Sequence, residues 1–94
     1  MSLLHDAFAR AKSENRAALI AYLPAGYPTE DGAVECIAAM VEGGVDIVEI
    51  GFPYSDPVMD GPTIQDAVNI SLEGGTKSAT VMNTVKRVAD LGVP

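Results

Sequence analysis

Two carboxylates, Glu49 and Asp60, are the residues best suited to chemistry in this sequence. Glu49 interrupts residues 45–50, an apolar and largely β-branched run that is typical of a buried strand, and Asp60 ends the proline-containing stretch that follows. An ionised carboxylate in an apolar setting must be paired or neutralised, so its position there indicates a function. Two carboxylates in different environments can divide acid–base work and charge stabilisation between them.

Side-chain alternation predicts the direction in which Glu49 points. In a strand, Ile47, Glu49 and Gly51 share one face, and Val48 and Ile50 share the other. We expect Val48 and Ile50 to pack against a helix. Glu49 would then project from the opposite face, at the carboxyl end of its strand, where α/β folds bind their ligands.

Each candidate residue also has a purely structural explanation. Glu49 could be a buried glutamate that pairs with a structural arginine. Asp60 could be the first residue of an Asp-Gly turn whose side chain bonds to nearby backbone. Ser55 has little support as a nucleophile, because the only histidine, His5, lies in a predicted N-terminal helix and no second base is near.

The size and charge of the chain limit its class. Its 94 residues allow one small domain, residues 1–94. The net charge of −7 and the pI near 4.3 argue against nucleic acid or an anionic membrane, both of which require basic patches. The sequence has neither an apolar run of about 18 residues nor the basic start of a signal peptide, so we expect a cytoplasmic protein. The single cysteine, Cys36, cannot form an internal disulfide and fits a reducing compartment.

The first half of the sequence alternates helix and strand signals. Ser2 suits the N-cap of a helix that ends near residue 12, and residues 17–23 form a short apolar run that predicts a strand. Thr29 is the expected N-cap of a second helix, which the glycine pair at residues 43–44 ends. The residues of this helix expected to face the core are Val34, Ile37, Ala38 and Val41, with Cys36 as small core filling.

Two more helices are predicted after the proline-containing stretch. Pro62 suits the first position of a helix that ends at residues 74–75, and Ser78 or Thr80 is the expected cap of another that ends at Gly92. The apolar positions expected to be buried are Ile64, Ala67, Val68 and Leu72 in the first helix, and Val81, Met82, Val85, Val88 and Ala89 in the second.

This order of elements predicts an α/β architecture. A strand–helix–strand unit implies two parallel strands with a right-handed crossover. Two parallel strands leave both sheet edges open and cannot be covered on both faces. We therefore expect the opening part of a larger fold, with residues 93–94 as the start of another strand.

Two segments resemble the N-terminal part of the tryptophan synthase α subunit. They are residues 22–28, YLPAGYP, and residues 43–65, GGVDIVEIGFPYSDPVMDGPTIQ, in which strand, proline loop and helix start match in order and spacing. The resemblance implies the N-terminal βαβα portion of a TIM (β/α)8 barrel, a fold of roughly 250 residues, so the sequence is incomplete as given. It also implies a lyase that cleaves indole-3-glycerol phosphate to indole and glyceraldehyde 3-phosphate in tryptophan biosynthesis.

The resemblance assigns roles to individual residues. Glu49 and Asp60 match the family's catalytic glutamate and aspartate, and Tyr22 and Ile64 fall where the family lines its indole pocket. No cofactor is implied in this subunit, and pyridoxal phosphate is expected in a partner β subunit within an α2β2 assembly. The segment expected to contact that subunit comprises Pro53, Tyr54, Ser55, Asp56 and Pro57.

Two features of the family lie outside this sequence and leave other functions open. Its phosphate-binding segments and its mobile lid loop come later in the barrel, so we expect the isolated chain to be inactive. One alternative is a non-catalytic interaction module that docks a partner through residues 53–62. Another is a different phosphate-handling TIM-barrel enzyme. Glycine-rich phosphate loops later in the chain would favour either of the two enzymes over the interaction module.

Overall fold

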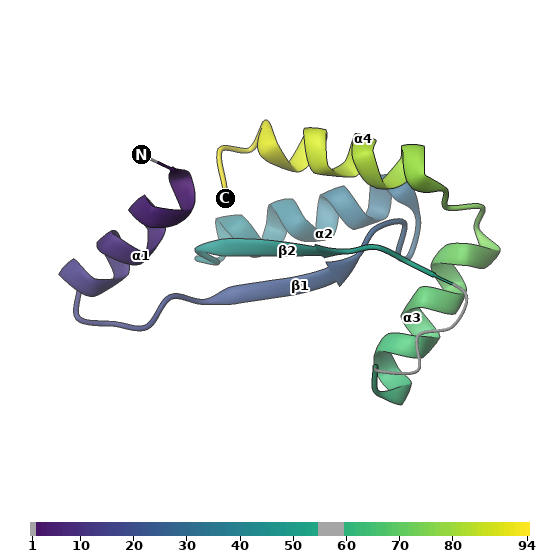
Figure 1. Cartoon of the computed structure of the whole chain (residues 1–94), viewed down its shortest axis with the longest axis horizontal. Coiled ribbons are helices and arrows are strands. Elements are labelled where there is room, and N and C mark those ends of the chain that lie inside the picture. Colours follow the sequence, from purple (N-terminus) through teal and green to yellow (C-terminus); the bar gives the residue numbers. More distant parts are fainter. Residues whose placement is uncertain (1, 55–59) are drawn as a thin grey trace.

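The computed structural model describes residues 2–54 and 60–94. Its elements follow the predicted order of helix, strand, helix, strand and two helices (Figure 1). Their bounds are α1 Leu3–Ser13, β1 Ile20–Pro24, α2 Glu30–Glu42, β2 Ile47–Gly51, α3 Pro62–Glu73 and α4 Ser78–Ala89.

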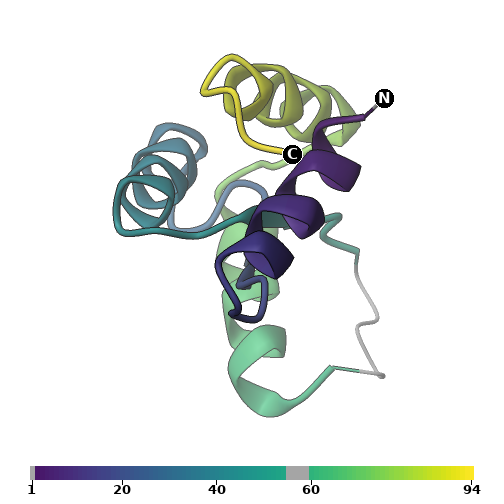
Figure 2. The same ribbon diagram turned by 90° about the vertical axis from the view of Figure 1, so that its left-hand side faces the viewer.

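The two strands form a parallel sheet in which Ile20 pairs with Ile47 and Pro24 pairs with Gly51. Helices α2 and α4 lie side by side over one face of the sheet, and α3 extends past the opposite side at the carboxyl ends of the strands (Figures 1 and 2). Helix α1 lies at the other end, where the strands begin. The predicted parallel pair is confirmed, and its carboxyl ends are the part of the sheet that a site can use.

The core lies between the sheet and the pair α2 and α4. Its buried residues are Ile37, Val88 and Val93, and Leu23, Val41, Val48 and Ile50 pack against them. Val48 and Ile50 therefore face the helices, as alternation along β2 predicts. The opposite face of β2 carries Glu49, which is exposed.

Most helix ends follow from local chemistry. The Ser2 and Thr29 side chains accept hydrogen bonds from the backbone N–H groups of His5 and Gly32, at 3.1 and 2.9 Å. Pro62 begins α3, where its missing N–H removes no helical bond. The predicted cap of α4 is wrong, because Lys77 is the N-cap and Ser78 is the first helical residue.

The predicted strand at residues 17–23 begins too early, because Ile20 is the first residue of β1. The backbone N–H of Leu19 donates to the Asp46 carboxylate at 2.8 Å, and the Leu19 carbonyl accepts from Asp46 N and Ile47 N. A side-chain bond therefore occupies the Leu19 N–H just before the regular ladder starts. At the far end, β2 continues through Gly51, one residue beyond the predicted run.

Two predicted helix faces differ from those observed. In α3, Ser71 is fully buried, and in α4 the buried residues are Val81, Thr84 and Val88. Met82, Val85 and Ala89, which were expected to be buried, are exposed, because the face of α4 that packs on α2 follows the spacing 81, 84 and 88. Cys36, expected as core filling, is exposed on α2.

Residue 94 contacts the free edge of β2. The backbone N–H of Val48 donates to the Pro94 carbonyl at 2.9 Å, which agrees with the predicted start of a strand at residues 93–94. Among the helices of the described residues, none combines the length and the apolar character needed to cross a membrane.

Candidate active site at the carboxyl ends of the strands

Tyr22 and Glu49 are register partners on neighbouring strands. In a parallel sheet, paired residues project from the same face, so both side chains lie on the face away from α2 and α4. Glu49 is exposed there, which corrects the expectation of a buried carboxylate, because α2 and α4 cover only the other face. Among the ion pairs of residues 2–54 and 60–94, none includes Glu49, so a structural pairing with arginine has no support in the described chain.

The Tyr22 side chain leans along its strand until its ring lies against the backbone of Gly51. A Cβ atom built on Gly51 would lie 2.6 Å from Tyr22 Cζ and 2.9 Å from Cε2, and closer still to the hydroxyl oxygen. These separations are below van der Waals contact. Gly51 and Glu49 lie on the same face of β2, two residues apart, so Tyr22 covers the end of the strand beside the carboxylate.

Both candidate carboxylates act electrostatically on Tyr22. Burial raises the pKa of the Tyr22 phenol, and the negative charges of Asp60 and Glu49 raise this pKa further. The phenol therefore remains protonated at neutral pH. Asp60, eleven positions after Glu49 in the sequence, is thus near the same ring in space.

Asp60 stands at the entry to α3 and is half-buried. Its backbone carbonyl accepts a hydrogen bond from Gln65 Nε2 at 2.8 Å, which joins the residue to the first turn of the helix. Ile64 lies in that turn and is also half-buried. Figure 1 shows the C-terminal end of α3 beside the carboxyl ends of the strands, and the start of α3 below the sheet, on the side away from α2 and α4.

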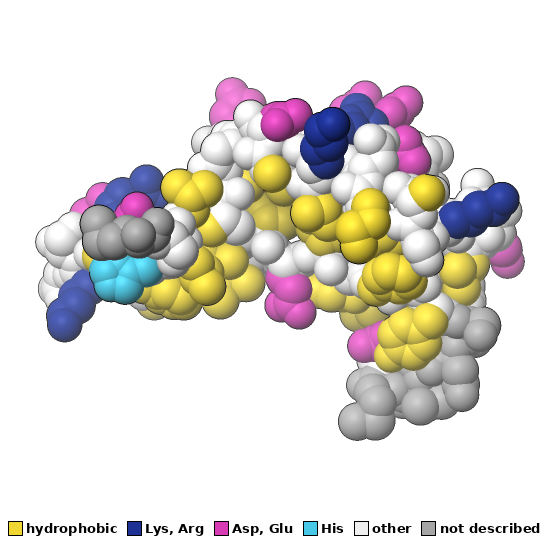
Figure 3. Space-filling model, turned by 45° about the horizontal axis from the view of Figure 1, so that its top comes forward, with side chains coloured by type: hydrophobic (Ala, Val, Ile, Leu, Met, Phe, Trp, Pro, Cys, Tyr) yellow, Lys and Arg dark blue, Asp and Glu magenta, His cyan; other side chains and the backbone are white. Residues whose placement is uncertain are grey.

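Two aromatic side chains precede the proline-containing stretch on the surface. Phe52 is 51% exposed and Tyr54 is 49% exposed, and Pro53 between them is buried. Exposed hydrophobic side chains are also visible across the face of the molecule between its α1 end and its α3 end (Figure 3). Ser55, Asp56 and Pro57, expected to contact a partner, lie outside the described residues.

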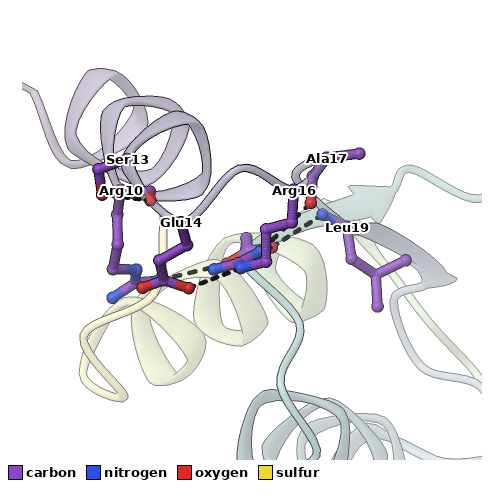
Figure 4. A network of polar contacts seen from close by, with 7 residues as sticks. Arg10, Ser13, Glu14, Arg16, Ala17 and Leu19 are labelled. Carbon is purple, nitrogen blue, oxygen red and sulfur yellow. Dashed lines mark hydrogen bonds and ion pairs between the residues drawn. The ribbon is translucent and has the colours of Figure 1, made fainter.

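The buried carboxylate of this chain is Asp46, which the analysis of motifs did not single out. Its side chain is 2% exposed and accepts from Arg16 at 2.8 and 3.0 Å, from Arg10 at 3.4 Å and from Leu19 N at 2.8 Å. The Arg16 guanidinium, followed by the Leu19 N–H, holds the pKa of Asp46 well below its usual range. Figure 4 shows Arg10, Glu14 and Arg16 converging on this point.

The position of Asp46 assigns it a structural role. It precedes β2 and lies at the opposite end of the strand from Glu49 and Gly51, beside α1. The available signal in the sequence was an acidic residue directly before an apolar run, with two arginines in or just after the first helix.

The described residues contain no cluster of histidine, cysteine and acidic side chains that could hold a metal ion.

The family model described as "Tryptophan synthase alpha chain" matches residues 8–94. The tryptophan synthase alpha chain of Streptomyces coelicolor is 58% identical over 86 residues, which cover 92% of this chain and 32% of that protein. The one from Salinispora arenicola is 49% identical over 94 residues, covering all of this chain and 35% of the relative. The chain thus spans about a third of the length of the curated relatives it matches.

Solved structures give the same result for the fold. Tryptophan synthase from M. tuberculosis in its aminoacrylate-bound form superposes with a TM-score of 0.92 at 44% identity, covering 99% of this chain and 38% of that chain. Tryptophan synthase subunit alpha from Legionella pneumophila superposes with a TM-score of 0.89 at 29% identity, covering 96% and 34%. The predicted N-terminal portion of a TIM barrel is therefore confirmed. The chain belongs to the tryptophan synthase alpha chain family.

Proposed function

We propose that these residues form part of the active site of a lyase that cleaves indole-3-glycerol phosphate to indole and glyceraldehyde 3-phosphate. Membership of the family supports this proposal. The observation that carries it is that Glu49 and Tyr22 are register partners on one face of the sheet, with the charge of Asp60 close enough to raise the pKa of the Tyr22 phenol. Two carboxylates beside one aromatic ring suit a substrate whose ring must gain a proton and then carry positive charge.

Glu49 is the proposed proton-transfer group. Cleavage requires a proton on indole C3, which turns the ring into a leaving group, and the loss of a proton from the adjacent glycerol hydroxyl as the carbon–carbon bond breaks. The bonding electrons pass to the ring, and the hydroxyl carbon becomes the aldehyde. A carboxyl group on a strand end is held in place by the ladder, which general acid–base catalysis requires.

Asp60 is the proposed stabilising charge. Protonation at C3 places positive charge on the ring nitrogen, and an ionised carboxylate beside that N–H lowers the energy of the transition state. The hydrogen bond from Gln65 to the Asp60 backbone fixes the position of Asp60 just before α3 begins. Tyr22, on β1, and Ile64, in the first turn of α3, supply the proposed walls for the indole ring.

The proposal extends to an assembly. Residues 1–94 form one unit of a larger barrel, and Pro53, Tyr54, Ser55, Asp56 and Pro57 contact a β subunit that holds pyridoxal phosphate. The exposure of Phe52 and Tyr54 supports a docking role for this part of the chain, because exposed aromatic residues often anchor interfaces. The setting proposed for this assembly is the cytoplasm.

The experiment that tests the proposal measures indole release from indole-3-glycerol phosphate. It uses the full-length protein, meaning a chain of the relatives' length that contains these 94 residues, with and without a β subunit. Indole must appear with the parent and be lost in Glu49→Gln. The absence of indole from a folded parent in the presence of the β subunit would overturn the proposed function. Binding of the β subunit without any lyase activity would favour an interaction module.

A further inference from the structure

The contact between Tyr22 and Gly51 concerns the shape of the proposed site. Glycine is commonly needed where the backbone adopts a left-handed conformation, but Gly51 lies in regular strand geometry, paired with Pro24. Gly26, by comparison, has φ of +78°. The requirement at position 51 is therefore one of space, and the three heavy atoms nearest to the position of such a Cβ all belong to Tyr22.

Hydrogen bonds hold the backbone at Gly51 in place. The Gly51 carbonyl accepts a hydrogen bond from Ala25 N at 2.9 Å, and Ala25 is completely buried. The Ala25 carbonyl in turn accepts from the Ser71 hydroxyl at 2.6 Å, which ties this strand end to α3. A side chain at position 51 would consequently displace the end of the Tyr22 side chain, which is the more mobile of the two groups.

Tyr22 has a defined place only if that space remains open. Tyr22 is 37% exposed, and its register places it with Glu49 on the face of the sheet away from α2 and α4. Contact with Gly51 holds it over the end of β2, beside Glu49 and within the influence of Asp60. A displaced ring would project into the space where the proposed substrate ring must lie.

We propose that Gly51 is a positioning residue for substrate binding, which acts through Tyr22 by leaving room for its ring at the end of β2. This inference rests on the proposed function, since it deepens the account of the same site. Gly51 touches no reacting atom. Its substitution should impair the fit of the indole ring and leave the proton transfers at Glu49 largely intact.

The kinetic test is a double-mutant cycle in the full-length protein. Gly51→Ala is expected to raise KM for indole-3-glycerol phosphate at least tenfold while kcat stays within about threefold, because binding is lost more than chemistry. In a Tyr22→Leu background, Gly51→Ala should change KM less than twofold, because leucine has no atoms at the positions of the Tyr22 hydroxyl, Cζ and Cε2. Equal losses in both backgrounds, or an unchanged KM in Gly51→Ala, would overturn the inference.

Gly43→Ala is the matched control. Gly43 ends α2 with φ of −76°, and a Cβ there would make only ordinary contacts at 3.4 and 3.5 Å. The same methyl group is thus added at a glycine that has room for it, far from the carboxyl ends of the strands. This variant should keep the KM of the parent, and an equal rise in KM would mean that glycine loss acts through general destabilisation.

A second measurement does not depend on activity. The ¹³Cζ signal of Tyr22, assigned by its disappearance in Tyr22→Phe, should shift in Gly51→Ala and stay in place in Gly43→Ala. An unmoved signal in Gly51→Ala overturns the inference, whether or not the protein releases indole. A parent protein that releases no indole overturns the proposed function, and this outcome is separate from the position of the signal. If Gly51→Ala fails to fold, Gly51→Ala combined with Tyr22→Leu must fold, and failure of this double variant also overturns the inference.

Discussion

Arg16 and Asp46, thirty positions apart in the sequence, form a two-pronged ion pair in which Nη1 lies 2.8 Å from Oδ2 and Nη2 lies 3.0 Å from Oδ1. Two parallel bonds from one guanidinium fix both the distance and the plane of the carboxylate. The same carboxylate accepts from Leu19 N, so the pair joins the segment after α1 to the starts of both strands. This cluster holds the end of the sheet opposite the proposed active site.

Loss of the Asp46 charge should destabilise the full-length protein. Asp46→Asn leaves Arg16 without its buried partner and is expected to lower Tm at pH 7 by more than about 5 °C. Asp31→Asn is the matched control, because Asp31 also lies 2.8 Å from an arginine, Arg87, but is 77% exposed, and exposed pairs contribute little. Thermal unfolding followed by circular dichroism measures both, and equal losses would contradict a special role for Asp46.

The effect of Asp46→Asn should depend on pH in a defined direction. Because the folded-state pKa of Asp46 is lowered, its stabilisation is fully present above the unfolded-state pKa of about 4 and declines as the pH falls below that value. The difference in Tm between parent and Asp46→Asn should therefore be constant from about pH 6 to 8 and shrink between about pH 4 and 2. A difference that grows in acid would show that the sign is wrong.

Glu49→Gln should abolish turnover while substrate still binds. Glutamine keeps the shape and hydrogen bonding of the side chain but cannot transfer the proton, and general acid–base catalysis typically contributes about a hundred- to ten-thousand-fold. Single-turnover kinetics and a separate measurement of substrate affinity distinguish the two effects. If this variant retains more than about a tenth of the parent rate, Glu49 is not the proton-transfer group.

Asp60 should respond to charge more than to shape. Asp60→Asn is expected to lose roughly a hundred- to a thousand-fold in rate, the usual cost of removing one well-placed electrostatic group. Asp60→Glu should recover part of that loss, because the negative charge survives on a longer side chain. Rates measured on the two variants side by side are decisive, and equal rates would indicate that Asp60 acts by its geometry instead.

Tyr54→Ala should weaken binding of a β subunit by about tenfold while the intrinsic lyase rate stays close to that of the parent. The reason is that Tyr54 is 49% exposed beside a buried proline, which presents its ring to a partner. Met82→Ala serves as the control, since Met82 is 62% exposed on α4. Titration calorimetry gives both affinities, and an unaltered affinity in Tyr54→Ala would remove this residue from the interface.

Ser71→Ala should reduce the free energy of unfolding by about 1–3 kcal/mol, because it leaves the buried Ala25 carbonyl without its hydrogen-bond donor. Ser78→Ala removes a hydroxyl from an exposed helical position and should cost much less. Urea unfolding of both variants in the full-length protein measures the difference. Indistinguishable midpoints would mean that the Ala25 carbonyl finds another donor.

The sequence by itself determined the features that depend on neighbours along the chain. Ser2, Thr29 and Pro62 set helix starts through backbone groups within three residues, and alternation in β2 separates Val48 from Glu49. The motif around Glu49 and Asp60 was equally local, and it predicted the family and the TIM-barrel fold that the comparisons confirmed.

Only the tertiary structure decided which polar groups are buried and which contacts require a particular residue. Asp46 is buried because Arg16, thirty positions away, neutralises it, and Ser71 is buried because Ala25, forty-six positions away, accepts its hydrogen bond. Gly51 needs to be glycine because the ring of Tyr22 reaches it across the sheet. Such requirements depend on pairs of residues far apart in sequence, and no local pattern carries them until the chain has folded.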